Sequence, residues 1–291
     1  GGFLDGEYHA GFYYTAQVLI DTFLQKRPVS PQGLVTLLGD RGANKAADTA
    51  EIQQLLDGFG LQVASLFPGR SSIAEMQAIP ASALSITLGG KGRSKVWLKR
   101  LAVYLETKFA VPFLDKEYPV GFAETRDWLL ALGKLLQKED IAQKAVKIQE
   151  KRLEDAAEKY RPYFQGLKTV LCIARPADFF PFAWIFELLA FLNIRLEGVM
   201  LFKELTPAQK NDLRGELQQY TAAPILDEQD AIRLMQQTDF LLTTYELETE
   251  QKQFYLPVLP PLGIGGVIKV MAKMARLFTN ENRRSNVVYG W

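Results

Sequence analysis

Basic side chains follow several predicted strands of this chain, where a parallel sheet usually meets its ligand. Two of these loops lead into a helix N-terminus, and others contain glycine, which lets the backbone approach a ligand closely. Guanidinium groups and helix N-termini both favour negative charge. The pattern predicts an anion-binding cleft, with candidate residues Arg41, Arg70, Ser71, Lys91, Arg93 and Arg175. The alternative is a set of ordinary exposed loops, in which arginine is common.

The sequence offers few residues for a metal site, for nucleophilic catalysis or for a phosphate-binding loop. The chain has one histidine, His9, and one cysteine, Cys172, so a zinc site built from several such ligands is excluded. A nucleophile elbow of the G-x-S-x-G type is missing from the sequence. The run Gly89–Gly92 is not a phosphate-binding Walker loop, because no Gly-Lys-Ser/Thr ends it. We therefore identify no catalytic residue in the sequence and predict no metal ligand.

Two further runs have a structural interpretation. The run Gly263–Gly266 lacks the final glycine spacing of a dinucleotide-binding fingerprint, so we expect a loop that leads into a helix. The aromatic residues between Phe179 and Phe186 are expected at the start of a helix, where packing in the core is favoured over a cofactor cage.

The composition describes an ordinary globular protein. The 291 residues are 48% hydrophobic and 23% charged with a formal net charge of +1, which allows two domains and argues against a nucleic-acid partner. A single cysteine excludes a disulfide scaffold. We find no apolar stretch of membrane-spanning length and no signal peptide, so we expect a cytoplasmic protein with no membrane partner. Because no initiator methionine is present, we expect a fragment of a longer protein.

Short apolar runs alternate with helical patterns along the chain, which indicates a parallel sheet with right-handed crossovers. The expected strands cover residues 33–40, 61–67, 83–88, 111–114, 168–174, 196–202, 223–226, 239–244 and 255–259. The expected helices cover residues 48–60, 71–77, 95–109, 125–136, 138–164, 179–191, 207–219 and 266–278.

The polar segment 138–164 interrupts this rhythm. Only a thin apolar stripe runs along it, formed by Ile141, Ala145, Ile148 and Leu153, and such a helix commonly connects two domains. We therefore predict an α/β protein with two doubly wound, Rossmann-like parallel-sheet domains joined by a long helix. The predicted boundaries are residues 1–137, 138–165 and 166–291. Arg175 can join the other candidate residues only if the two sheets face each other.

Several segments, in this order, resemble the nitrogenase component 1-type oxidoreductase family. This family includes the nitrogenase molybdenum-iron protein alpha and beta chains, cofactor-assembly scaffolds and dark-operative protochlorophyllide reductase subunits. The similar segments are Gly2–Gly11 with the helix to Phe23, Leu34–Asp40, Glu51–Leu61, Ser72–Met76, Ala83–Leu88, Tyr104–Pro112 and Gly121–Thr125. Chains of this family resemble three α/β domains in series, and the present sequence would correspond to the later two.

The sequence also departs from this family. The catalytic nitrogenase chain would have a cluster-binding cysteine where this chain has Leu88–Gly90, and a histidine ligand where it has Val258–Pro261. The cysteines for the electron-relay cluster would belong to the first domain, outside this chain. The resemblance therefore implies a beta-type or scaffold-like subunit without a cofactor in this fragment. An iron–sulfur cluster is expected only in the full-length protein or complex.

The resemblance implies two kinds of partner, a homologous subunit in a hetero- or homo-oligomer and a reductase that donates electrons. The first functional hypothesis is an oxidoreductase subunit whose cluster ligands lie outside this chain. The alternative is a non-catalytic cofactor-assembly protein, or one that binds an anionic small molecule in the interdomain cleft.

Overall fold

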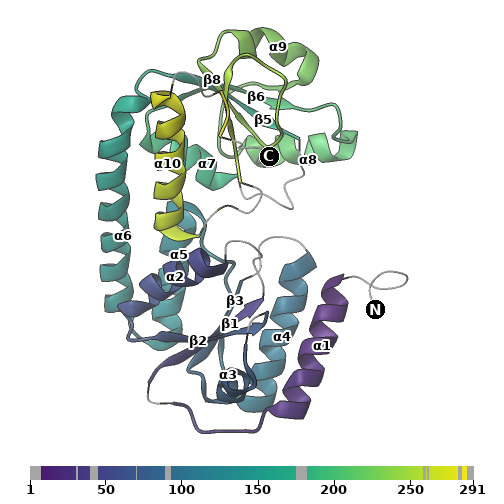
Figure 1. The fold of residues 1–291 in the computed structure, drawn as a ribbon, viewed down its shortest axis with the longest axis vertical. Helices are drawn as coiled ribbons and strands as arrows, with labels where there is room; N and C mark the ends of the chain where they lie inside the picture. Colours follow the sequence, from purple (N-terminus) through teal and green to yellow (C-terminus); the bar gives the residue numbers. More distant parts are fainter. Residues whose placement is uncertain are drawn as a thin grey trace. The chain divides into compact units, whose positions relative to one another are not determined.

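The structure is a computed structural model (Figure 1) and describes residues 8–30, 32–39, 45–69, 71–88, 93–174, 182–257, 260, 262–280 and 284–286. These residues form two compact units. The first contains residues 1–119 and 124–148, and the second contains residues 120–123 and 149–291. Each unit is built on one parallel sheet.

The first unit contains a four-stranded sheet in the order β2-β1-β3-β4. Its strands are β1 (Leu34–Gly39), β2 (Gln62–Pro68), β3 (Leu84–Thr87) and β4 (Phe113–Leu114). Its helical segments are α1 (Tyr8–Phe23), α2 (Lys45–Asp57), α3 (Ile73–Ala78), η2 (Ile79–Ala81) and α4 (Arg93–Phe109), with most of α5 (Gly121–Leu136). All strand pairs are parallel.

The second unit contains a five-stranded sheet in the order β7-β6-β5-β8-β9. Its strands are β5 (Lys168–Ile173), β6 (Arg195–Leu201), β7 (Ile225–Asp227), β8 (Phe240–Thr243) and β9 (Lys252–Tyr255). Its helical segments are η3 (Arg161–Tyr163), α7 (Ala183–Phe191), α8 (Pro207–Leu217), α9 (Glu228–Gln236) and α10 (Gly263–Thr279). These strands are also parallel throughout.

Both sheets are doubly wound, as predicted. In the first sheet the chain moves from β1 outward to β2, and then returns past β1 to β3 and β4. In the second sheet it moves from β5 outward to β6 and β7, and then returns to β8 and β9 on the other side. The strand order therefore reverses between β1 and β3 and between β5 and β8, which are the places where such folds bind ligands.

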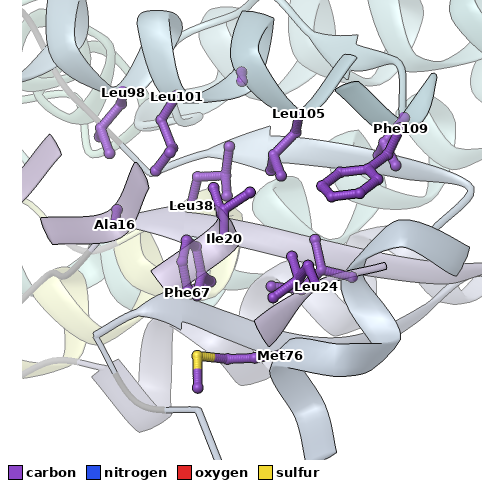
Figure 2. Packing of buried hydrophobic residues seen from close by; sticks show 13 residues of the cluster. Ala16, Ile20, Leu24, Leu38, Phe67, Met76, Leu98, Leu101, Leu105 and Phe109 are labelled. Atoms are coloured by element: carbon purple, nitrogen blue, oxygen red, sulfur yellow. The ribbon is translucent and has the colours of Figure 1, made fainter. Parts of the chain in front are cut away.

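The core of the first unit shows why its elements pack in this way. Leu98, Leu101 and Leu105 recur at helical spacing along α4 and point toward Leu38 of β1 and Phe67 of β2 (Figure 2). Helix α1 adds Ala16, Ile20 and Leu24 to the same buried cluster, and α3 adds Met76. Helices α1, α3 and α4 thus cover one face of the sheet, and α1 and α4 lie side by side (Figure 1).

The long helix α6 (Glu139–Tyr160) begins in the first unit and ends in the second, with the change after Ile148. Within its apolar stripe, Leu153 is buried whereas Ile148 is 64% exposed. The buried residues are Ala142, Gln149, Leu153, Ala156 and Ala157. The domain boundaries inferred from the sequence, with residues 138–165 as a separate connector, remain a prediction.

Other differences from the predicted elements are local. Helix α7 begins at Ala183 rather than at Phe179, and residues 179–181 lie outside the described residues. Strand β9 ends at Tyr255, where the predicted strand was expected to begin. Helix α9 was not predicted, and α10 already includes the glycine-rich run from Gly263 that was expected as a loop.

Candidate functional site

The carboxyl edge of the first sheet brings three predicted loops together at their starting points. Leu38 of β1 pairs with Phe67 of β2 and with Thr87 of β3, so the three strands end side by side. The loops that carry Arg41, Arg70 and Lys91 leave from these strand ends. The parallel register therefore supplies the common edge that the anion-site hypothesis requires within this unit.

The candidate residues themselves are only partly described. Ser71 is half-buried, and its hydroxyl donates a hydrogen bond to the backbone oxygen of Leu66 at 3.0 Å, so that proton is already used within the protein. Arg93 is the first residue of α4, while its side chain lies outside the described part of the chain. The remaining candidates, Arg41, Arg70, Lys91 and Arg175, lie outside the described residues, so the anion site stays a prediction.

The residue at the end of β1 is a glycine for steric reasons. Gly39 has φ +117°, a conformation that residues with a side chain rarely adopt. A Cβ atom placed there would lie 3.1 Å from Cδ1 of Leu98 on α4. This glycine lets α4 pack close against the strand end that leads to Arg41.

The carboxyl edge of the second sheet has a different chemistry. Thr243 and Thr244 follow one another at the end of β8, and both are fully buried. The backbone N–H of Ala174, just after β5, donates to Oγ1 of Thr244 at 2.8 Å. The backbone N–H of Tyr245 donates to Oγ1 of Thr243 at 3.0 Å. The Thr244 hydroxyl thus links the end of β8 to the end of β5, from which the loop carrying Arg175 leaves, and the Thr243 hydroxyl stabilises the backbone just after β8.

The sequence analysis did not identify this threonine pair. A pair of threonines at the end of an apolar strand was the available signal, because buried hydroxyls are retained where backbone groups need hydrogen-bond partners. Their present contacts assign them a structural role at this edge.

Cys172 is the only cysteine in this chain that could bind an iron–sulfur cluster. Cys172 is fully buried in β5, between β6 and β8, and burial raises the pKa of its thiol far above the ordinary range. Cluster ligands are thiolates, usually several of them. In the part of the chain that the structure describes, no group of three His, Cys, Asp or Glu side chains could hold a metal ion. The residues present do not fit such a cluster.

Two of the aromatic residues near α7 are core residues, as predicted, while Phe179 and Phe180 lie outside the described residues. Phe182 and Trp184 are buried at 0% and 1% exposure, and Phe186 stacks on Tyr220 with ring centroids 5.4 Å apart.

In the described segments, we find no helix with the length and apolar character needed to cross a membrane.

The two parallel, doubly wound sheets place the protein among Rossmann-like α/β proteins. A model of the nitrogenase component 1 type oxidoreductases matches residues 1–253. The chain therefore belongs to this family, which confirms the resemblance inferred from the sequence.

Two relatives are light-independent protochlorophyllide reductase B subunits. That of Chloroflexus aurantiacus is 31% identical over 124 residues, which cover 40% of this chain and 21% of the relative. That of Nephroselmis olivacea is 27% identical over 110 residues, which cover 37% of this chain and 20% of the relative. The matched part of the chain thus spans about a fifth of the length of these relatives.

Solved nitrogenase structures share the fold. The structure of nitrogenase Cp1 at pH 5 has a TM-score of 0.58 at 11% identity, and the match covers 95% of this chain and 63% of that chain. Nitrogenase Cp1 at pH 6.5 has a TM-score of 0.57 at 12% identity, and the match covers 93% of this chain and 63% of that chain. At these identities the likeness concerns the fold alone.

Proposed function

We propose that this chain is part of a reductase subunit, in which it supplies an α/β framework while the metal-cluster ligands come from outside the chain. The observation that carries the proposal is the burial of Cys172. This chain belongs to the family but has a single cysteine, and the thiol of that cysteine is buried in the central part of a sheet. A cluster would need several accessible thiolates.

A beta-type or scaffold-like role fits the residues better than a catalytic one. The positions where the sequence resemblance implies cluster ligands hold Leu88–Gly90 and Val258–Pro261. None of these residues has a side chain that binds iron. We further propose that the full-length subunit pairs with a homologous subunit and receives electrons from a separate reductase, because the related chains are named as subunits of a reductase.

Anaerobic reconstitution tests this proposal. Residues 1–291 and the full gene product are incubated separately with iron and sulfide, desalted, and analysed for iron and for the absorption of a cluster. We expect a cluster on the full gene product, alone or with its homologous subunit, and none on residues 1–291. Cys172→Ala is the matched variant and should leave both results unchanged. A stoichiometric cluster on residues 1–291 that is lost in Cys172→Ala would contradict the proposal.

The second candidate function is non-catalytic binding of an anionic cofactor or small molecule. It is favoured by the register of β1, β2 and β3, which starts three loops with basic residues at one sheet edge. The test is calorimetric titration with inorganic phosphate. An Arg41→Ala, Arg70→Ala double variant should weaken binding by at least about 1.5–3 kcal/mol, the scale of one hydrogen bond to a charged group. Lys26→Ala, Arg27→Ala, at exposed positions after α1, is the control. Equal binding by both double variants would exclude this site.

A further inference from the structure

The outward face of α4 carries apolar side chains that the fold does not cover. Val96 and Val103 are 52% and 42% exposed, and with Arg100 and Thr107 they follow the spacing i, i+4, i+7 and i+11. The leucines of α4 point to the opposite side, into the core (Figure 2). A stripe with this spacing on a helix already anchored to a sheet is the pattern that receives another helix.

Aromatic residues of α1 border the same stripe. The ring centroids of Tyr13 and Trp97 are 5.5 Å apart, and those of Tyr14 and Trp97 are 6.2 Å apart. Tyr14 is 59% exposed, and Val18, one helical turn further along α1, is 63% exposed. Trp, Tyr and Arg are the residue types that contribute most to binding energy in protein interfaces.

Along this face of α4 lies a groove with a volume of about 570 Å³. Most of its lining comes from α4, and α1, which lies beside α4 in the first unit (Figure 1), contributes Tyr13. It is lined by Tyr13, Lys95, Val96, Lys99, Arg100, Val103, Tyr104 and Thr107. The lining therefore combines valine and aromatic surface with three cations, and none of these described residues carries a carboxylate.

The charge of Arg100 is the feature that selects a partner. Its guanidinium lies 4.5 Å from the ring centroid of Trp97, and among the described residues it has no carboxylate partner. The neighbouring lysines are already paired, Lys95 with Glu117 and Lys99 with Asp115, both at 2.6 Å. A guanidinium held over an aromatic ring is pre-positioned for a carboxylate that approaches from outside.

We propose that this groove binds an amphipathic helix of a partner protein, with an apolar face on Val96 and Val103 and acidic residues that meet Arg100. A second copy of this chain fits less well. If the same face were used by both copies, two-fold pairing would place the Arg100 side chains of both copies in one desolvated interface without added carboxylates. The inference does not depend on the function proposed above, because the groove lies on the outer side of α4.

The test uses two synthetic helical peptides of about 18 residues with the same leucine face, one with glutamates and one with lysines on its flanks. Binding to residues 1–291 is followed by fluorescence anisotropy. We expect the acidic peptide to bind more tightly than the basic one. Arg100→Glu and Val103→Glu should each weaken binding of the acidic peptide by about tenfold or more. Arg100→Glu should also improve binding of the basic peptide.

Matched controls come from α9, where Ile232 and Arg233 are exposed. Ile232→Glu and Arg233→Glu should leave both affinities unchanged, and circular dichroism checks that all four variants are folded. Equal binding of the acidic and basic peptides, no binding of the acidic peptide, or no effect of Arg100→Glu would overturn the proposal. So would a concentration-dependent dimer that Val103→Glu abolishes, because the occupant would then be a second copy.

Discussion

The carboxylate of Glu187 offers the sharpest test of how the second unit is held together. Its Oε2 accepts a hydrogen bond from the backbone N–H of Phe122 at 2.7 Å, and Oε1 accepts one from Ala123 at 3.1 Å. These N–H groups belong to the first turn of α5, which has no earlier carbonyl to bind. Glu187 on α7 thus fixes residues 120–123 to the second unit, although the rest of α5 belongs to the first.

The expected cost of removing this carboxylate follows from the two contacts. Each hydrogen bond to a charged group contributes about 1.5–3 kcal/mol, and a negative charge at a helix N-terminus adds up to about 1 kcal/mol. Because the site is half-buried and water replaces part of the loss, we expect Glu187→Ala to lower the free energy of unfolding of this unit by about 2–4 kcal/mol. Glu187→Gln keeps the shape and one acceptor, so about half of that loss is expected.

A second substitution tests the geometry rather than the charge. Gly121 has φ +82°, and a Cβ atom there would lie 2.7 Å from Oε2 of Glu187 and 2.7 Å from Cβ of Trp184. Gly121→Ala should therefore be destabilising through backbone strain and steric overlap, even though the Glu187 side chain is retained.

The assay is urea unfolding monitored by hydrogen exchange, because exchange reports the stability of each unit separately. Glu204→Gln is the control, since Glu204 is an exposed glutamate in the same unit, and its effect should stay within about 0.5 kcal/mol. If Glu187→Ala changes the stability of the second unit no more than Glu204→Gln does, the reasoning about this helix terminus is refuted.

Four further predictions concern buried or charged groups. Ser85 is fully buried and its hydroxyl has no hydrogen-bond partner among the described residues, so Ser85→Ala should be neutral or stabilising in urea unfolding. Thr36→Val should instead cost about 1–2 kcal/mol, because it removes hydrogen bonds to two buried serine hydroxyls. Lys210 and a neighbouring arginine hold the pKa of Asp227 below its ordinary value of 3.8. The stability from this pairing is present above that value and is lost as the pH falls through the folded-state pKa, so Asp227→Asn should flatten the acid side of the stability profile. Burial raises the pKa of the Cys172 thiol, so a thiol reagent should label it in denaturant and leave it unmodified in the native protein; rapid native labelling would contradict its placement in the sheet.

The sequence predicted the strands best where hydrophobicity alone decides the structure. The prediction for β1 covered the whole observed strand and began one residue too early, at Gly33, while its last residue, Asp40, lies outside the described residues. The strand was found because a run buried on both faces of a parallel sheet is continuously apolar. Strand β9 was misplaced because the observed strand begins with Lys252 and Gln253, which looked like a loop. Gln253 is nevertheless buried, and its side chain bonds the backbone of Leu247 through both amide atoms.

Helix α9 was missed for a related reason. Its nine residues are mostly polar, and only Ala231 is fully buried. The start of the helix at Asp227 is a typical N-cap position, but the side chain of Asp227 is paired with Lys210 instead of capping the helix. Because α9 is only nine residues long, its apolar pattern covers a short stretch of sequence, which was not recognised as a helix.

The candidate site could be predicted only as far as the sheet edge. Parallel winding places strand ends together, and the pairing of Leu38 with Phe67 and Thr87 agrees with that part of the prediction. Whether the basic side chains converge depends on loop conformations, which glycine-rich segments leave open. The structural role of Thr244 depends on a contact with Ala174, 70 residues away in the chain, and local sequence patterns do not encode such a contact.

The position of Cys172 links the fold to the proposed function. It pairs with Met200 on β6 and with Thr243 on β8, so its strand has neighbours on both sides. Its side chain packs in a cluster with Val170, Met200 and Leu241. For the thiol to reach a cluster, β5 would have to leave both neighbours and expose this core. A cysteine in this place acts as a small apolar residue. The proposed function therefore assigns the cluster thiolates to residues beyond this chain, and under that proposal the sheet around Cys172 is a rigid framework rather than a ligand.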